Sequence, residues 1–344
     1  MKKFYISTIL CSILLIPVSN ACTVWGAVTP NELLIAKNRD FYPGNQNFKV
    51  IKKKHKYSFL GLYGDNEYDN NYVIKMGINE TGLTVFMTFA SSVPLKQRTA
   101  KVPYYKVMEN ILKNYNNIDK VYNDSKELFK DSTPINYIFA DRNKAMICEI
   151  GLNNEYRCIK YSRNNYKVIP FAQTNHYLHV DLAKYNFTPR VNQQSSYYRY
   201  FKIRELMESN LNSLSFEKFI NFSFNTEASN DNPLAKFDLG YNNTYQENSI
   251  FRTFNSHPDR KDKLHKNSDQ GVSTMIVSIP INKKPIKVYL RIINSINDLN
   301  DKNFTQKIKY SEAITTLNHA INYPNAIKYN NKVCIRDKNT KTCL

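Results

Sequence analysis

Cys22 and Asp40 are the first residues whose types and positions could carry chemistry. A cysteine at a free N-terminus can act as both nucleophile and base, because its α-amino group titrates near roughly 8 and its thiol near roughly 8.5. Such a site needs a carboxylate that holds the amine and donors that stabilise an oxyanion. Asp40 ends a predicted strand in the run Lys37-Asn38-Arg39-Asp40 and is the best candidate for the carboxylate. Taken alone, it could equally be a solvated acid in a turn.

The residues before Cys22 have the layout of a secretory signal peptide. A pair of lysines precedes an apolar run from Phe4 to Val18, and Ser19-Asn20-Ala21 supplies the small residues that a signal peptidase requires. The apolar run is too short and too interrupted to predict a membrane span. We expect residues 1–21 to be removed, which leaves Cys22 at the N-terminus of an exported protein, periplasmic or secreted. A lipoprotein cysteine is the rival interpretation, although a lipoprotein signal has a leucine-like residue where Ser19 stands.

The cysteine count favours one free thiol. The chain has six cysteines, and loss of the one at position 11 leaves an odd number in an oxidising compartment. Cys148 and Cys158 flank a short polar stretch between two predicted strands, so a disulfide across that hairpin is expected. Cys334 and Cys343 bracket a polar loop in the same way. These pairings leave Cys22 free, whereas the alternative for Cys148 and Cys158 is a pair of buried thiols.

The charge does not indicate a nucleic-acid-binding protein. The formal charge of +19 falls to +17 when Lys2 and Lys3 leave, since residues 1–21 contain no acid. The lysines are scattered along the sequence, and export removes the chain from nucleic acid. Attraction to anionic lipid or polysaccharide surfaces stays open.

Short alternating runs and helical periodicities group as strands, helices, strands, helices and strands, which is typical of an α+β fold. We find no linker or repeat and predict a single domain over 22–344, with a polar surface loop or insertion at 225–270. The predicted helical segments are 104–115, 118–129, a region that opens at 195, and 215–224. The predicted strands are 23–28, 33–38, 57–63, 72–78, 83–89, 136–140, 145–150, 156–161, 166–170 and, as the last two, 273–279 and 286–292.

Five motifs in order along the chain carry a family resemblance. They are Cys22-Thr23, the run from Leu34 to Asp40, the run from Gly77 to Leu83, Thr174-Asn175-His176 and Ser195-Ser196-Tyr197-Tyr198-Arg199, with Asn248 to Thr253 as a later landmark. Together they resemble the linear-amide hydrolases grouped with choloylglycine hydrolase. The branch named for acyl-coenzyme A:6-aminopenicillanic acid acyltransferase is the most similar.

The resemblance implies an N-terminal-nucleophile (Ntn) hydrolase with an αββα four-layer sandwich. By position, Cys22 matches the nucleophile, Asp40 the aspartate that orients its amine and thiol, Asn175 a side-chain oxyanion donor, a backbone N–H near Phe89 or Ala90 the second donor, and Arg199 an arginine that tunes the nucleophile. Read without the family, Asn175 would be a turn residue and Arg199 a solvated helical arginine.

Arg39 is a further candidate for the site, but here the chain departs from its relatives. Many relatives read Arg-Asn-x-Asp, with the arginine three positions before the aspartate. This chain reads Asn38-Arg39-Asp40, so Arg39 stands directly before the aspartate instead.

His176, His179 and Asp181 form a spacing that could also suggest a metal site. A hydrolytic zinc centre requires further ligands or a helical frame that the sequence does not provide. We therefore expect neither a metal nor a cofactor.

The favoured function is hydrolysis of a linear, non-peptide C–N amide bond of an N-acylated small molecule through a Cys22 thioester. Transfer of the acyl group to an amine acceptor is the first alternative. A basic envelope-binding lipoprotein without catalytic activity is the second, and it would require a lipidated Cys22. The oligomeric state stays open, a homo-oligomer included.

Overall fold

The computed structural model describes residues 22–41, 45–65 except 53 and 55, 71–187 except 99, 165 and 166, 190–225, 270–300, 305–336 and 341–343. The expected signal peptide, most of the predicted loop at 225–270 and the landmark at 248–253 therefore lie outside the described residues.

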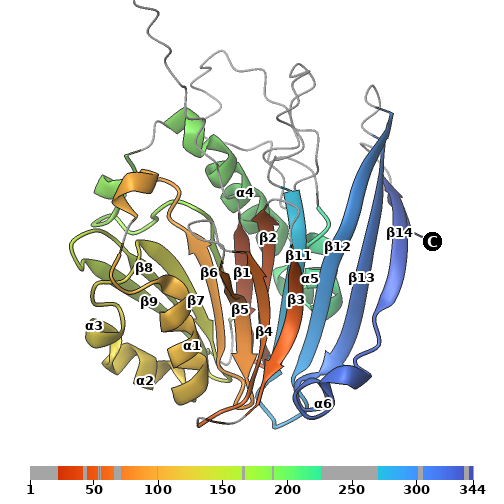
Figure 1. Ribbon diagram of the computed structural model, residues 1–344, viewed down its shortest axis with the longest axis horizontal. Helices are drawn as coiled ribbons and strands as arrows, with labels where there is room; N and C mark the ends of the chain where they lie inside the picture. Colours follow the sequence, from red (N-terminus) through yellow and green to blue (C-terminus); the bar gives the residue numbers. More distant parts are fainter. Residues whose placement is uncertain are drawn as a thin grey trace, which may run out of the picture.

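Two antiparallel sheets make up the centre of the molecule (Figure 1). The first has eight strands in the order β10 (Ile169–Gln173), β1 (Thr23–Val28), β2 (Glu32–Phe41), β11 (Gln270–Pro280), β12 (Lys287–Asn300), β13 (Thr305–Thr316), β14 (Asn330–Arg336) and β15 (Lys341–Cys343). The second has seven strands in the order β3 (Gln46–Ile51), β4 (Phe59–Asp65), β5 (Tyr72–Asn79), β6 (Thr84–Phe89), β7 (Ile135–Ala140), β8 (Lys144–Ile150) and β9 (Tyr156–Ser162).

The helices are α1 (Tyr104–Asn114), α2 (Ile118–Asn123), α3 (Ser125–Leu128), α4 (Arg190–Glu208), α5 (Phe216–Phe222) and α6 (Leu317–Asn322). Short 3-10 turns cover Leu95–Gln97, Ala183–Tyr185, Leu211–Ser213 and Pro324–Ala326. No helix in the described part of the chain is long and apolar enough to cross a membrane.

The main apolar core lies between the two sheets. Val24 and Ile35 of the eight-stranded sheet pack in one cluster with Leu60 and Phe86 of the seven-stranded sheet. Since strand side chains alternate between faces, the odd-numbered residues of β2 from Leu33 onward face this core.

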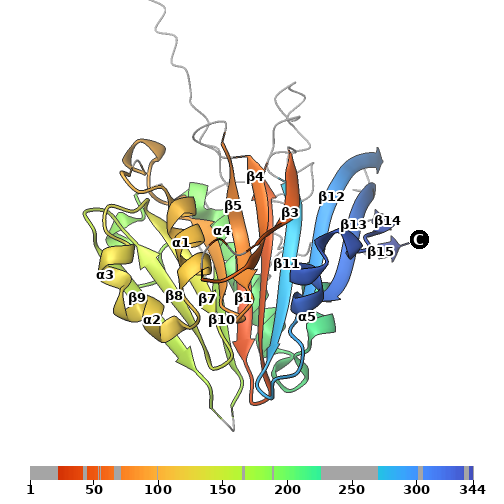
Figure 2. The same cartoon turned by 60° about the horizontal axis from the view of Figure 1, so that its bottom comes forward.

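Helices pack against strands of both sheets. Helices α1 and α2 join a cluster with β4 to β8, and α4 and α5 join another with β1, β2 and β11. Figure 2 shows α1, α2 and α3 on one side of the molecule. The α+β class is thus confirmed as two packed antiparallel sheets with separate helices.

The prediction that the chain ends in two last strands was wrong, because α6, β13, β14 and β15 follow them. Both ribbon views place β12, β13 and β14 at one side of the molecule, beyond the edge strand β3 (Figures 1 and 2). Strand β3, which was also missed, alternates half-buried and exposed residues. Polar composition hid these strands, since a strand with one solvated face needs few apolar residues.

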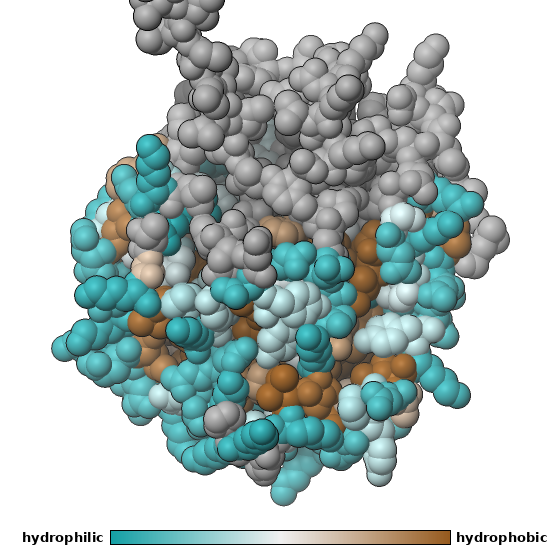
Figure 3. Space-filling view, in the orientation of Figure 1, coloured by the Kyte–Doolittle hydropathy of each residue, from teal (hydrophilic) through white to brown (hydrophobic). Residues whose placement is uncertain are grey.

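Polar side chains dominate the described part of one face of the molecule (Figure 3). Figure 3 shows one face of the molecule as largely hydrophilic where it is described, with apolar side chains in separate areas.

The predicted disulfide between Cys148 and Cys158 is present and joins β8 to β9 across the hairpin. Cys334 is also disulfide-bonded, and Cys343 lies directly opposite it in the register of β14 and β15. Among the described cysteines, Cys22 is the free one. This pattern agrees with the expectation from the odd cysteine count.

Candidate active site

Cys22 directly precedes β1, which is an inner strand between β10 and β2. Its side chain is buried, with 3% of its surface exposed. Val24, two residues further on, faces the core between the sheets and is paired with Lys37 of β2. The alternation of side chains along β1 therefore directs Cys22 toward the space between the sheets.

Asp40 is brought next to Cys22 by the antiparallel pairing of β1 with β2. The backbone N–H of Asp40 donates to the sulfur and lowers the pKa of Cys22, whereas the Asp40 carboxylate raises it. Burial is the largest influence and leaves the Cys22 pKa above its usual value. The thiol therefore holds its proton at neutral pH and needs a nearby base to become a nucleophile.

Arg199 of α4 contacts Cys22 and links it to Asn175, which lies in the loop after β10. Arg199 is buried and donates from Nη1 to the carbonyl oxygen of Cys22 at 2.5 Å and to the hydroxyl of Thr23 at 2.9 Å. Its Nη2 donates to Oδ1 of Asn175 at 3.0 Å. Two residues that are distant in sequence from Cys22 are thus connected to it through one guanidinium group.

The other side of the Asn175 amide faces the end of β6. Nδ2 of Asn175 donates to the carbonyl oxygen of Phe89 at 3.0 Å, which leaves that nitrogen one further hydrogen. The carbonyl and the following N–H of a trans peptide point in opposite directions, so the Ala90 N–H points away from the Asn175 amide. The structure therefore places the carbonyl of Phe89 at the predicted site, and the use of the Ala90 N–H as second oxyanion donor stays a prediction.

Arg39 faces the space between the sheets but is engaged with other residues. Its Nη1 donates to Oε1 of Gln46 at 3.1 Å, and its guanidinium group stacks over the ring of Phe41 at 4.2 Å. Its charge lowers the pKa of Cys22, but less than the charge of Lys37 does. Arg39 thus borders the site at the edge formed by β3.

Lys37 is a site residue that the sequence analysis missed. It is fully buried, and its ammonium is the strongest of the groups that lower the pKa of Cys22. Nζ donates to the carbonyl oxygen of Lys75 at 3.0 Å and lies 3.6 Å from the sulfur of Met87. The available signal was its position three residues before Asp40, where many relatives have arginine, and its place on the inward-facing side of β2.

The histidines of the alternative metal site point to different partners. His176 is buried, with its Nδ1 2.8 Å from the Ser196 hydroxyl and its ring 3.9 Å from that of Tyr197. His179 lies instead near Asp181, which is ion-paired with Arg157. In the part of the chain that the structure describes, no cluster of His, Cys, Asp and Glu residues could hold a metal ion.

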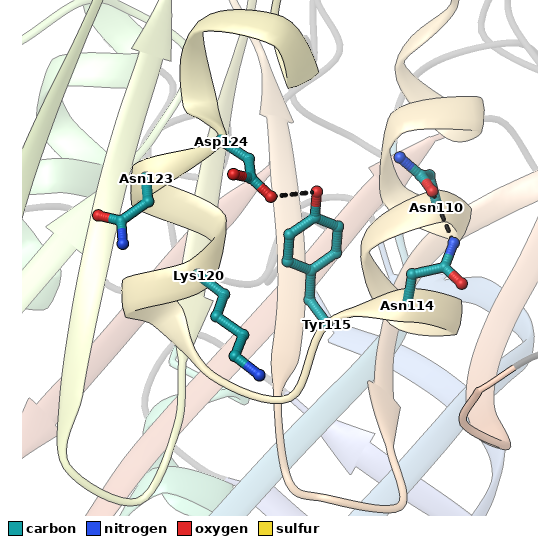
Figure 4. A pocket seen from close by; sticks show the side chains of 6 residues that line it. All are labelled: Asn110, Asn114, Tyr115, Lys120, Asn123 and Asp124. Atoms are coloured by element: carbon teal, nitrogen blue, oxygen red, sulfur yellow. Dashed lines mark hydrogen bonds between the residues drawn. The ribbon is translucent and has the colours of Figure 1, made fainter.

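A surface pocket elsewhere on the molecule contains none of the site residues. It lies between α1 and the α2–α3 segment, where the Tyr115 hydroxyl donates to Asp124 at 2.9 Å (Figure 4). The residues that line it are Asn110, Asn114, Tyr115, Lys120, Asn123 and Asp124.

The sequence model of the family described as acyl-coenzyme A:6-aminopenicillanic acid acyl-transferase matches residues 28–235, more than half of the 344-residue chain. The chain belongs to this family. Asp40, Asn175 and Arg199 lie inside the matched range, so membership rests on the region that contains most of the site. No curated protein sequence matches the chain significantly.

Two similar solved structures are of conjugated bile acid hydrolase from Clostridium perfringens. One is an arginine-to-leucine variant with 15% sequence identity and a TM-score of 0.47, and the match covers 86% of this chain and 96% of that chain. The other is a cysteine-to-alanine mutant with 14% identity and a TM-score of 0.49, covering 90% of this chain and 96% of that chain.

Proposed function

We propose that this protein is an exported cysteine amidase that hydrolyses the linear C–N amide bond of an N-acylated small molecule. The observation that carries the proposal is the position of Cys22, buried against the Asp40 N–H and connected through Arg199 to Asn175. The family is named for transfer of an acyl group, which requires the same attack on an acyl carbon. Residues 1–21 are removed, and 22–344 form one catalytic domain with the αββα layering of Ntn hydrolases.

The first chemical step forms a thioester. The free α-amine of Cys22 takes the thiol proton, and the sulfur attacks the amide carbonyl carbon, whose π electrons move to oxygen. The second hydrogen on Nδ2 of Asn175 donates to that oxyanion. The ammonium then protonates the leaving nitrogen, and the C–N bond breaks.

The second step releases the acyl group as an acid. Water attacks the thioester carbon while the Cys22 amine accepts one of its protons, and the sulfur leaves as the re-protonated thiol. Within each step, Asp40 stabilises the ammonium form of the amine through its negative charge. Arg199 keeps the Cys22 carbonyl and the Asn175 amide in fixed orientation.

The decisive experiment is intact mass spectrometry of the exported protein, first alone and then after incubation with each of a panel of N-acyl amides and quenching with acid. We expect a chain that begins at Cys22 and gains the mass of the acyl group there. Protein that keeps Ala21 is the matched control, since it has the same thiol but no free amine on Cys22, and it should be inactive. A lipidated Cys22, or a start at any other residue, would overturn the proposed mechanism.

Acyl transfer is the second candidate, and the description of the family favours it. The thioester is common to both reactions, and only the second nucleophile differs. Product analysis with a competing amine separates them: an amide product that increases with the amine concentration indicates transfer, whereas free acid alone indicates hydrolysis.

A further inference from the structure

Thr88, Asn136 and Glu149 form a polar row across three neighbouring strands. Thr88 of β6 pairs with Asn136 of β7, and Asn136 pairs with Glu149 of β8. Directly paired residues on neighbouring strands point to the same face of a sheet. Phe86 and Ile138 on this face belong to the apolar core between the sheets, and all three polar side chains are buried.

The first two members of the row bind the residue before the oxyanion donor. The hydroxyl of Thr88 donates to the carbonyl oxygen of Thr174. Nδ2 of Asn136 donates to the same oxygen at 3.2 Å and to the Thr88 hydroxyl, also at 3.2 Å. The peptide group that leads into Asn175 is therefore attached to the opposite sheet at two points.

Glu149 binds the same segment on both sides of Asn175. Its Oε1 accepts from the backbone N–H of Leu178 at 2.7 Å and from Nε2 of Gln173 at 3.2 Å, and its Oε2 accepts from the backbone N–H of His179 at 2.9 Å. One carboxylate thus joins β10 to the loop that follows it. Hydrogen bonds to a charged acceptor are among the strongest in proteins.

Two further contacts complete the support of the loop. Nε2 of Gln173 also donates to the carbonyl oxygen of His176 at 2.8 Å. On the other side of the loop, the backbone N–H of Asn175 donates to the Ser196 hydroxyl of α4 at 2.8 Å. Asn175 is consequently held between the seven-stranded sheet and α4.

We propose that Glu149, as the end of this row, is a positioning residue that holds Asn175 in the orientation needed to stabilise the oxyanion. It acts through the loop at 173–179, which its hydrogen bonds hold on both sides of Asn175. The inference rests on the proposed amidase activity. A small displacement of the Asn175 amide would weaken a bond made chiefly in the transition state, so turnover is affected more than substrate binding.

The test substitutes Glu149→Gln, which keeps the size of the side chain but replaces one acceptor oxygen by an NH₂ group. That group faces a backbone N–H and cannot bind it. We expect kcat for an N-acyl-4-nitroanilide that the wild type hydrolyses to fall by about 10- to 100-fold, below the usual loss for deleting one oxyanion donor. KM should stay within about twofold, because the effect is on the transition state.

Alkylation of Cys22 by iodoacetamide separates a positioning role from general damage. The sulfur displaces iodide from a saturated carbon, so no oxyanion forms and Asn175 is not needed. The rate of alkylation, followed by intact mass, should therefore stay within about twofold of the wild-type rate. A loss of alkylation equal to the loss of kcat would overturn the proposal.

Glu312→Gln is the matched control. Glu312 lies on β13, where it accepts a hydrogen bond from the Tyr289 hydroxyl at 2.7 Å. The kcat of the Glu312→Gln variant should equal that of the wild type. Thr88→Val is the second variant if Glu149→Gln fails to fold, since it removes only the hydroxyl from a residue of the same shape. Its kcat should fall and Thr88→Ser should restore it.

The outcomes distinguish the two proposals. A wild-type protein that hydrolyses no amide and forms no acyl adduct on Cys22 overturns the amidase function, and the positioning role with it. An active wild type with kcat unchanged in Glu149→Gln, or in Thr88→Val where Glu149→Gln does not fold, overturns the positioning role alone.

Discussion

Arg199 donates to Oδ1 of Asn175 at 3.0 Å, and the same guanidinium donates to the carbonyl oxygen of Cys22 at 2.5 Å. A guanidinium group has donors only, so the Asn175 atom that it binds must be the oxygen. The amide nitrogen is thereby turned toward the Phe89 carbonyl, which it contacts at 3.0 Å. Arg199 thus fixes which end of the Asn175 amide faces each neighbour, and it fixes the position of Asn175 relative to Cys22.

The first prediction concerns the donor itself. Asn175→Ala should lower kcat by roughly 10²- to 10³-fold, the usual loss for one oxyanion donor. Asn175→Asp should be at least as severe, because its carboxylate still binds Arg199 but offers no N–H and carries the same charge as the oxyanion. Steady-state kinetics measure both, and wild-type turnover in either variant would remove Asn175 from the mechanism.

The second prediction concerns the pH dependence of the thiol. The Lys37 ammonium lowers the pKa of Cys22, so Lys37→Met should raise it. A higher pKa leaves less thiolate at a given pH, and a rise of one unit would slow iodoacetamide alkylation about tenfold below the pKa. The rate-against-pH curve should therefore move to higher pH. Lys37→Arg keeps the charge and should move the curve back, whereas identical curves for Lys37→Met and wild type would contradict the argument.

Lys37 also illustrates what could be predicted from the sequence. Cys22 and Asp40 were identified because their types and the signal-like segment before Cys22 define a known chemistry. The burial of Lys37 was not foreseen, because a lysine is normally solvated and its surroundings depend on pairing between distant strands. The groups that Lys37 contacts are the backbone carbonyl of Lys75 in β5 and the sulfur of Met87 in β6, and both strands lie in the other sheet.

For the fold too, some strands could be predicted from the sequence and others could not. Strand β1 was predicted at the residues where it is found, since its apolar run is buried on both faces. Strands β13 and β14 were missed because polar residues occupy their exposed positions, as at Lys309. Pairing with an existing sheet, which the sequence pattern does not encode, is what makes those segments strands.

The third prediction concerns the disulfide between Cys148 and Cys158. The bridge closes a loop with a sequence separation of 10. Removing a bridge across a loop of that size lowers the free energy of unfolding by about 2–4 kcal/mol, because the unfolded chain gains entropy. The double variant Cys148→Ala, Cys158→Ala should lower the free energy of unfolding by that amount. Urea unfolding under non-reducing conditions measures it, and an unchanged midpoint with an unchanged slope would show that the bridge is absent or ineffective. Peptide mapping should still find Cys22 free.

The last prediction concerns stability at acid pH. Burial, and secondly the charge of Arg199, lower the pKa of His176 from its ordinary value to about 3. In the unfolded chain the same imidazole titrates near roughly 6.5. Below that pH the unfolded state therefore binds a proton that the folded state does not bind. The contribution of His176 is therefore fully present above pH 6.5 and is lost as the pH falls toward 3, by at most about 1.4 kcal/mol per pH unit.

His176→Gln removes this titration and keeps a polar side chain opposite the Ser196 hydroxyl. The variant is expected to be less stable than the wild type at neutral pH, because it gives up the packing of the ring against Tyr197. Its free energy of unfolding should nevertheless fall less steeply between pH 6 and pH 4. The difference in slope should be at most about 1.4 kcal/mol per pH unit, which corresponds to one proton. Urea unfolding at pH 7.5, 6, 5 and 4 gives both slopes, and His319→Gln, at an exposed position on α6, controls for the loss of a histidine elsewhere. Parallel curves for His176→Gln and wild type across this range would mean that His176 takes up its proton in the folded state as readily as in the unfolded one.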